Sequence, residues 1–189
     1  MKSHIRPIFH PITPAFSIHT EALTLDIALH DKGEFCHQHN EEKVTIYCPR
    51  HTQFEAGDFQ PWFRDIVRQV LRIQAKRFLT PRVAQWSEVT HLPYKRLFLK
   101  NVRTKWGSYS SMGNINLSIY LMVLPLRYID YTICHELCHS QEMNHGPQFW
   151  ALLDKYMDGQ AKQISREMKD MVKLWYETGD ARYLLICNQ

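Results

Sequence analysis

The feature that most constrains this chain is the segment His135-Glu136-Leu137-Cys138-His139. Histidines four residues apart lie one turn apart on a helix, so both imidazoles project from one face toward a common point. Two such imidazoles can chelate one zinc ion. Glu136 lies about 100° round the helix from His135, which suits a general base better than a further ligand. The fold must therefore supply a helix with one buried face and one face on a site.

The residues before the motif predict that helix. Pro125 stands where the first helical turn tolerates proline. Leu126, Ile129, Ile133 and Leu137 then follow at intervals of three and four residues, which is the spacing of an apolar stripe on a helix. We expect this stripe to face the core, with the histidines on the other side and Cys138 turned away from Glu136 as a buried thiol.

A third metal ligand is expected from the segment after the helix. A catalytic zinc usually has three protein ligands and keeps a fourth position for water. His145 lies six residues after His139, in a segment that must leave the helix before Gly146-Pro147 begins another. The spacing matches the long motif H-E-x-x-H-x-x-G-x-x-H, except that Glu142 replaces the glycine. The sequence thus predicts zinc held by His135, His139 and His145, with Glu136 as the catalytic base.

The remaining patterns predict an α+β fold. Alternating residues indicate strands, and helical spacing indicates further helices. In chain order we expect strands at Ala22–Leu29 and Lys43–Cys48 as an antiparallel hairpin or meander, a long amphipathic helix over Trp62–Phe78, strands at Lys95–Val102 and Asn114–Ile119, then helices from Pro147 and over Gln160–Tyr176. Glycines and serines between residues 107 and 113 indicate a turn. We expect one domain over residues 1–189, with N-terminal strands over about residues 15–56 and a catalytic core over about residues 57–180.

Composition narrows the class of protein. The N-terminal segment Met1–Pro7 has no following apolar stretch of the length of a secretory signal, and the longest apolar run, Ile119–Leu126, is too short to span a membrane. Five cysteines at irregular positions are typical of reduced thiols. We therefore expect a cytoplasmic protein without a membrane anchor. The formal charge of +4 permits an acidic partner without requiring one.

The central third of the chain resembles the YgjP-like metallopeptidase domain family, which is related to the WLM and SprT-like zincins. Three segments carry the resemblance: residues 103–108 (RTKWGS) with 113–117 (GNINL), the motif at 135–139, and residues 144–150 (NHGPQFW). The resemblance implies a zincin-like fold, zinc on the three histidines, and peptide hydrolysis with Glu136 as base. Tyr109 stands where the family often has cysteine, and Gly146 where it often has serine.

The expected reaction is peptide hydrolysis, in which Glu136 takes a proton from a zinc-activated water and later protonates the leaving amine. An extended substrate could pair with an edge strand, for which Asn114–Ile119 is the best candidate, although an ordinary sheet strand explains it equally well. Five side chains are candidates for a second oxyanion donor, although packing or solvation explains each: Tyr109, Tyr128, Tyr131, Arg103 and Lys105. Trp106 and Trp150 could wall the cleft, but core packing explains both.

Two other functions stay open. A protease of the SprT-like kind would act on DNA-bound proteins, and a group of basic residues could contact phosphates, although a solvated strand face also explains them: Lys95, Arg96, Lys100, Arg103 and Lys105. A non-catalytic metal-binding module is the other alternative, but a structural zinc would not need Glu136. Cys36, His37 and His39 lie close in sequence without a matching second pair, so we expect them to be surface residues.

Overall fold

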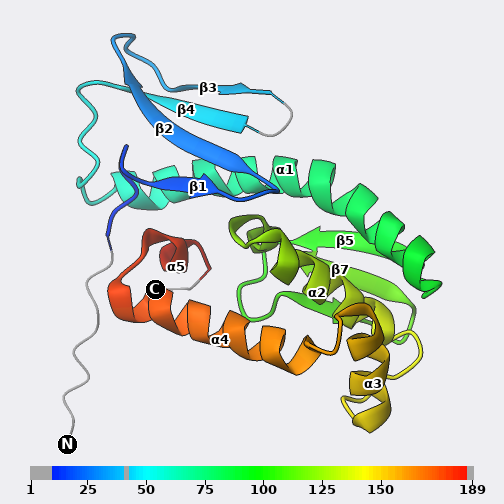
Figure 1. Cartoon of the computed structure of the whole chain (residues 1–189). Helices are drawn as coiled ribbons and strands as arrows, with labels where there is room; N and C mark the ends of the chain where they lie inside the picture. The colour runs from blue at the N-terminus through cyan, green and yellow to red at the C-terminus, as the bar shows by residue number, and fades with distance from the viewer. Residues whose placement is uncertain (1–9, 41–42, 187–189) are drawn as a thin grey trace, which may run out of the picture.

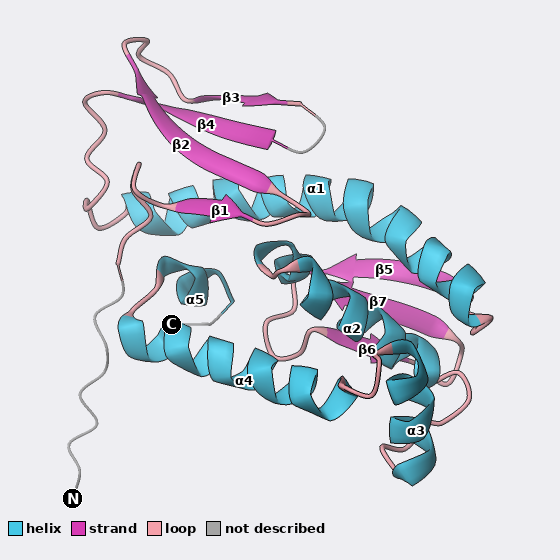
Figure 2. Ribbon diagram, in the orientation of Figure 1, coloured by secondary structure: helices cyan, strands magenta, loops and turns pink. Residues whose placement is uncertain are grey.

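The computed structural model describes residues 10–40 and 43–186, which form an α+β fold, as the sequence predicts (Figures 1 and 2). The strands are β1 (Ser17–His19), β2 (Thr24–His30), β3 (Cys36–His39), β4 (Lys43–Pro49), β5 (Arg96–Lys100), β6 (Gly107–Tyr109) and β7 (Asn114–Ser118). The helices are α1 (Phe59–Thr90), the 3-10 helix η1 (Ile119–Val123), α2 (Leu126–Cys138), α3 (Pro147–Tyr156), α4 (Ala161–Thr178) and α5 (Ala181–Ile186).

The N-terminal sheet has the strand order β1-β2-β4-β3 and is mixed rather than antiparallel throughout. β1 pairs with β2, and β3 with β4, in antiparallel fashion, but β2 and β4 run parallel, with Leu25 opposite Val44. The prediction that these two strands belong to an antiparallel hairpin or meander was wrong, because they pair directly with each other in parallel. The physical reason is β3, a fully exposed strand in a stretch that looks like a polar loop. It reverses the chain once more before β4 begins.

Helix α1 lies between strands β2, β3 and β4 of the N-terminal sheet and the smaller sheet with the helices that follow (Figure 1). It runs well past the predicted end at Phe78 and contains Pro81. A proline removes one backbone donor and usually ends or kinks a helix. Here the helix continues because residues beyond the proline, among them Val83 and Thr90, are buried in the core.

The smaller sheet has the order β5-β7-β6, so β7 is its central strand. β7 pairs with β5 in parallel and with β6 in antiparallel fashion. Of residues 114–119, proposed from sequence as a substrate-binding edge, Asn114–Ser118 form this central strand with a paired strand on each side, so that prediction was wrong. The edge strands are β5 and β6, and β6, the one beside the motif helix, is only three residues long and lies in the segment predicted to be a turn. Its brevity hid the alternation by which strands are recognised.

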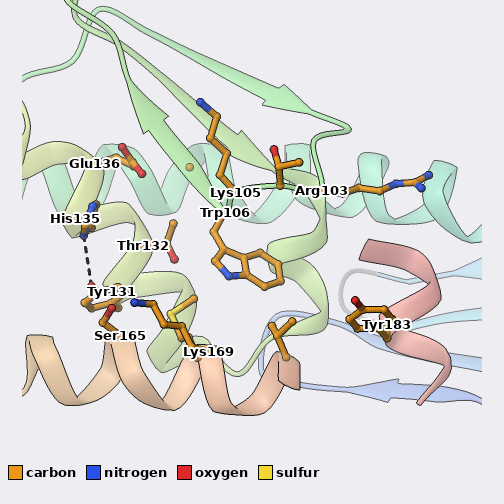
Figure 3. Close-up of a pocket in the computed structure, with 14 residues that line it drawn as sticks. Arg103, Lys105, Trp106, Tyr131, Thr132, His135, Glu136, Ser165, Lys169 and Tyr183 are labelled. Atoms are coloured by element: carbon orange, nitrogen blue, oxygen red, sulfur yellow. Dashed lines mark hydrogen bonds between the residues drawn. The ribbon is translucent and has the colours of Figure 1, made fainter. Parts of the chain in front are cut away.

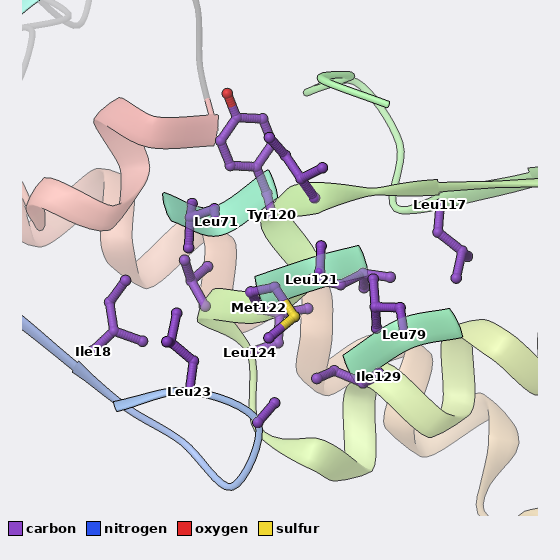
Figure 4. Close-up of a cluster of buried hydrophobic side chains, with 14 of the residues drawn as sticks. Ile18, Leu23, Leu71, Leu79, Leu117, Tyr120, Leu121, Met122, Leu124 and Ile129 are labelled. Atoms are coloured by element: carbon purple, nitrogen blue, oxygen red, sulfur yellow. The ribbon is translucent and has the colours of Figure 1, made fainter. Parts of the chain in front are cut away.

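The core lies between α1, η1 and α2, where large apolar side chains meet (Figure 4). Every residue of η1 is buried, and Tyr120 is among the largest fully buried side chains. Asp130 links α2 to α1, since the guanidinium of Arg82 donates to both its oxygens at 2.7 and 2.5 Å, and the indole of Trp86 donates at 2.9 Å. The helix that carries the motif is thus fixed by packing and by a bidentate ion pair.

The structure bears on two expectations from composition, the absence of a membrane-spanning helix and the reduced state of the cysteines. No helix in the described part of the chain combines the length and apolar character needed to cross a membrane. The four described cysteines are free thiols, and Cys138 is fully buried, as predicted. Cys187 and the N-terminal segment Met1–Pro7 lie outside the described residues.

Candidate metal centre and active site

The three histidines singled out from sequence meet in one cluster. His135 and His139 extend from the last turn of α2 and its cap, and His145 comes from the loop that leads to α3. One nitrogen of each lies within 4.8 Å of the others, and the Nε2 atoms of His135 and His145 are 2.9 Å apart. Among the residues that the structure describes, this is the one group of three or more metal-binding side chains so placed.

The Nδ1 nitrogens of His135 and His139 have partners outside the three-histidine cluster. Nδ1 of His139 donates to the carbonyl oxygen of Glu142 at 2.9 Å, since a carbonyl can only accept. Nδ1 of His135 lies 3.4 Å from the hydroxyl of Tyr131. The Nδ1–H of His139 leaves the lone pair on its Nε2 free to bind a metal. Burial lowers the pKa of His135 to about 3 and lowers that of His139, so both rings are neutral, the form that metals bind.

Phe149 on α3 is the common support of the three rings. It is fully buried, and its ring centroid lies 4.8, 4.7 and 4.6 Å from those of His135, His139 and His145. Next to it, the indole N–H of Trp150 donates to the carbonyl oxygen of His145 at 3.1 Å. The start of α3 therefore fixes the loop histidine relative to the two helical ones.

The turn between His139 and His145 is compatible with Glu142 in place of glycine. Among the described non-glycine residues, only His91 and Asp158 have a positive φ, so Glu142 lies outside the left-handed region that favours glycine. Its N–H donates to the carbonyl of Cys138 at 3.0 Å, which continues the helix turn. Gly146 has an ordinary φ of −76°, and an added Cβ would meet nothing within 4 Å. Neither departure from the resembled pattern disturbs the loop.

Glu136 is buried against β6, with only 5% of its surface exposed. A Cβ added at Gly107 would lie 2.6 Å from Oε1 of Glu136, closer than real side chains approach, so any larger residue here would displace the carboxylate. The backbone N–H of Tyr109 donates to the carboxylate. Strand β6 thus holds the glutamate from one side. Sequence reasoning missed this role of Gly107, although the residue lies inside the segment that carries the family resemblance.

Burial raises the pKa of Glu136 to about 8. The positive charge of Lys105 and the N–H of Tyr109 act in the opposite direction, because both favour the charged carboxylate. The carboxyl group is therefore held where it can bind and release a proton near neutral pH.

A cavity of about 490 Å³ opens beside Glu136 and His135, between β6, α4 and α5 (Figure 3). Trp106 lies at the centre of the cavity, and Arg103 and Tyr183 lie at the end away from His135. Of the five candidate oxyanion donors, Tyr131, Arg103 and Lys105 line this cavity. The other two are engaged elsewhere, since the hydroxyl of Tyr109 donates to the carbonyl of Pro93 and that of Tyr128 to Glu167.

A smaller hollow of about 250 Å³ lies on the histidine side of Glu136. It is bounded by His135, His139 and His145 together with β6. Glu136 and His135 line both spaces, so a ligand can reach the glutamate from either side.

The other residues considered from sequence lie elsewhere. Lys95, Arg96 and Lys100 are exposed on and before β5, at the far edge of the smaller sheet. Cys36, His37 and His39 are exposed on β3, which agrees with the predicted surface position.

Comparison with known proteins identifies relatives of the chain. The model of the YgjP-like metallopeptidase domain matches residues 16–171. Two solved structures overlap about half of this chain: the zymogen of Pyrococcus abyssi abylysin, a metallopeptidase, at 19% identity, with a TM-score of 0.43 over 48% of this chain and 91% of that one; and that of Methanocaldococcus jannaschii jannalysin, also a metallopeptidase, at 24% identity, with a TM-score of 0.41 over 49% and 92%. The curated proteins give no match.

Proposed function

We propose that this chain, which belongs to the YgjP-like metallopeptidase family, hydrolyses peptide bonds with a zinc ion held by His135, His139 and His145 and with Glu136 as general base. The observation that carries the proposal is the convergence of three imidazole nitrogens within 4.8 Å, next to a buried carboxylate. Three imidazoles make a donor set that zinc accepts, and they leave one position for a reacting group.

When bound, zinc would polarise the scissile carbonyl and make water acidic enough to lose a proton near neutral pH. The protein's own part begins with Glu136, which would take the proton from the attacking water and return it to the leaving amine. Gly107 and the N–H of Tyr109 hold that carboxylate in place. Tyr131 and the carbonyl of Glu142 orient His135 and His139.

The edge of β6 that faces away from β7 would bind the substrate backbone at Gly107, since the N–H of Tyr109 on the same edge already donates to Glu136. The N–H of Ser118 donates to the carbonyl of Trp106, and that of Ser110 to the carbonyl of Asn114, so the even-numbered residues of this segment face β7. The backbone groups of Gly107 and Tyr109 consequently point away from β7, toward the side of Glu136. An extended peptide could pair with the N–H and C=O of Gly107, two residues before Tyr109, whose N–H donates to Glu136.

The decisive experiment compares the wild type with Glu136→Gln and His145→Ala. We expect about one zinc per wild-type chain by elemental analysis, and metal-dependent cleavage of an unstructured protein such as casein, followed by mass spectrometry. Glu136→Gln should keep the zinc and lose about 100-fold to 10,000-fold in cleavage rate. His145→Ala should lose most of the zinc.

Two results would contradict the proposal. A non-catalytic module would bind zinc without any cleavage that depends on Glu136. Zinc content unchanged in His145→Ala would refute the three-histidine assignment.

A further inference from the structure

The cavity beside Glu136 has a composition that selects for a particular substrate. Its walls are largely apolar, with Trp106, Met168 and Val172 among them. Its charged groups are cationic except for the glutamate itself: Arg103, Lys105 and Lys169 line it, and Glu136 is the one carboxylate among its described lining residues. A binding site of this kind suits an apolar group that carries or adjoins a negative charge.

Lys169 is the cation best placed to receive that charge. It extends from α4 toward Tyr131 and Ser165, on the same side of the cavity as His135 (Figure 3). Its side chain is solvent-exposed, and the salt bridges of the described residues do not include it. By contrast, Lys173, one turn further along α4, pairs with Glu177 at 3.7 Å. Lys169 can therefore bind an incoming anion without breaking an ion pair.

The size of the cavity indicates more than one residue of substrate. About 490 Å³ lies within the roughly 300–1,000 Å³ of pockets that enclose small organic ligands. An apolar side chain against Trp106 leaves room for the next residue beside α4. The carboxylate that meets Lys169 can then belong to an Asp or Glu side chain or to the C-terminus of a short peptide.

We propose that this cavity binds the part of a peptide substrate next to the scissile bond, and that it favours an apolar residue followed by a carboxylate that contacts Lys169. The proposal rests on the proposed function, since it places the substrate beside Glu136. It also names the class of substrate: peptides with an apolar-acidic pair, or peptides whose C-terminal residue directly follows the apolar residue.

Binding to the zinc-loaded Glu136→Gln protein tests this without hydrolysis. Four versions of one peptide would be titrated by calorimetry: the sequence ends in Leu-Glu or Leu-Gln, each with a free or an amidated C-terminus. We expect the uncharged version, Leu-Gln amide, to bind about fivefold to tenfold more weakly than the best carboxylate-bearing version. A stronger effect of the side chain or of the terminus identifies which carboxylate the site uses.

Two further variants in the Glu136→Gln background test whether Lys169 causes the difference in affinity between charged and uncharged peptides. Lys169→Gln should abolish the difference between charged and uncharged peptides, and Lys173→Gln, on the same helix but outside the cavity, should preserve it. Equal binding of all four peptides, or a difference that survives in Lys169→Gln, would overturn the proposal. Wild-type cleavage is measured separately, so an inactive enzyme refutes the proposed function while the binding data still decide the role of the cavity.

Discussion

Histidines gather at two places in the described part of the chain, the candidate centre and strand β3, and only the first brings three metal-binding side chains together. At the candidate centre, the ring centroids of His139 and His145 are 4.8 Å apart. On β3, the rings of His37 and His39 are also close, at 5.9 Å. Ring proximity alone therefore does not distinguish the two places.

The difference lies in direction and support. Alternate residues of a strand project in parallel from one face, so His37 and His39 stack side by side while Cys36 points to the other face. A helix turn followed by a loop instead brings side chains from different directions to one point. At the candidate centre the rings also pack on a buried Phe149, whereas every residue of β3 is exposed. Fixed convergence, rather than residue type, makes the site.

The largest effect should come from removing Phe149, the buried ring on which the three histidines of the candidate centre pack. Phe149→Ala would leave a cavity under all three imidazoles and should lower the free energy of unfolding by about 3–5 kcal/mol. Chemical denaturation of the metal-free protein measures this change in the free energy of unfolding. Trp62→Ala is the control, because that aromatic side chain is 44% exposed and should matter less. A loss below about 1 kcal/mol in Phe149→Ala would mean that the rings do not depend on this packing.

Gly107→Ala should damage the reaction while sparing the metal. The new methyl group would overlap the carboxylate of Glu136 and displace it, and a shift of about 1 Å in a catalytic group can cost about 100-fold in rate. We expect kcat/KM for a cleaved peptide to fall by about that factor, with zinc content unchanged. Gly146→Ala, where a Cβ meets nothing within 4 Å, should retain wild-type activity. Equal activity of both variants would show that Gly107 does not position Glu136.

The extent to which sequence predicted the site follows from the range of the interactions. The helix, its buried face and the three histidines could be predicted because they depend on spacing within about 20 residues. Gly107, by contrast, meets Glu136 only through tertiary contact between β6 and α2. The same reason explains the wrong edge strand: β7 has the cleaner alternation because it is central and buried on one face, and the short β6 has none to show. Alternation reports burial, not position within a sheet.

The N-terminal region was predicted less well because pairing order is not a local property. Both β2 and β4 alternate as expected, but their parallel pairing depends on the exposed β3 between them. Likewise α1 continues through Pro81 because tertiary burial outweighs a local signal to stop.

A smaller effect is expected from the partner of His135. Tyr131→Phe removes the hydroxyl that lies 3.4 Å from Nδ1 and keeps the ring. Loss of such a partner typically costs about 10-fold to 100-fold in metal affinity, and the long contact indicates the lower value. Competition with a chromophoric chelator measures it. Tyr128→Phe is matched in position and chemistry, but its hydroxyl faces Glu167, so zinc affinity should not change. The same affinity in both variants would show that Tyr131 does not orient the ligand.

The smallest effect should come from the histidines of β3. Replacing His37 and His39 together with Ala removes two imidazoles whose rings stack, yet no fixed nitrogen geometry is lost, since both side chains are exposed on an edge strand. We expect the zinc content to stay at about one per chain and the free energy of unfolding to change by no more than about 0.5 kcal/mol. Elemental analysis and denaturation of this variant beside His145→Ala compare the two places directly. If the β3 variant lost zinc and His145→Ala kept it, the metal would belong to the exposed strand, and convergence on a buried support would not be what selects the site.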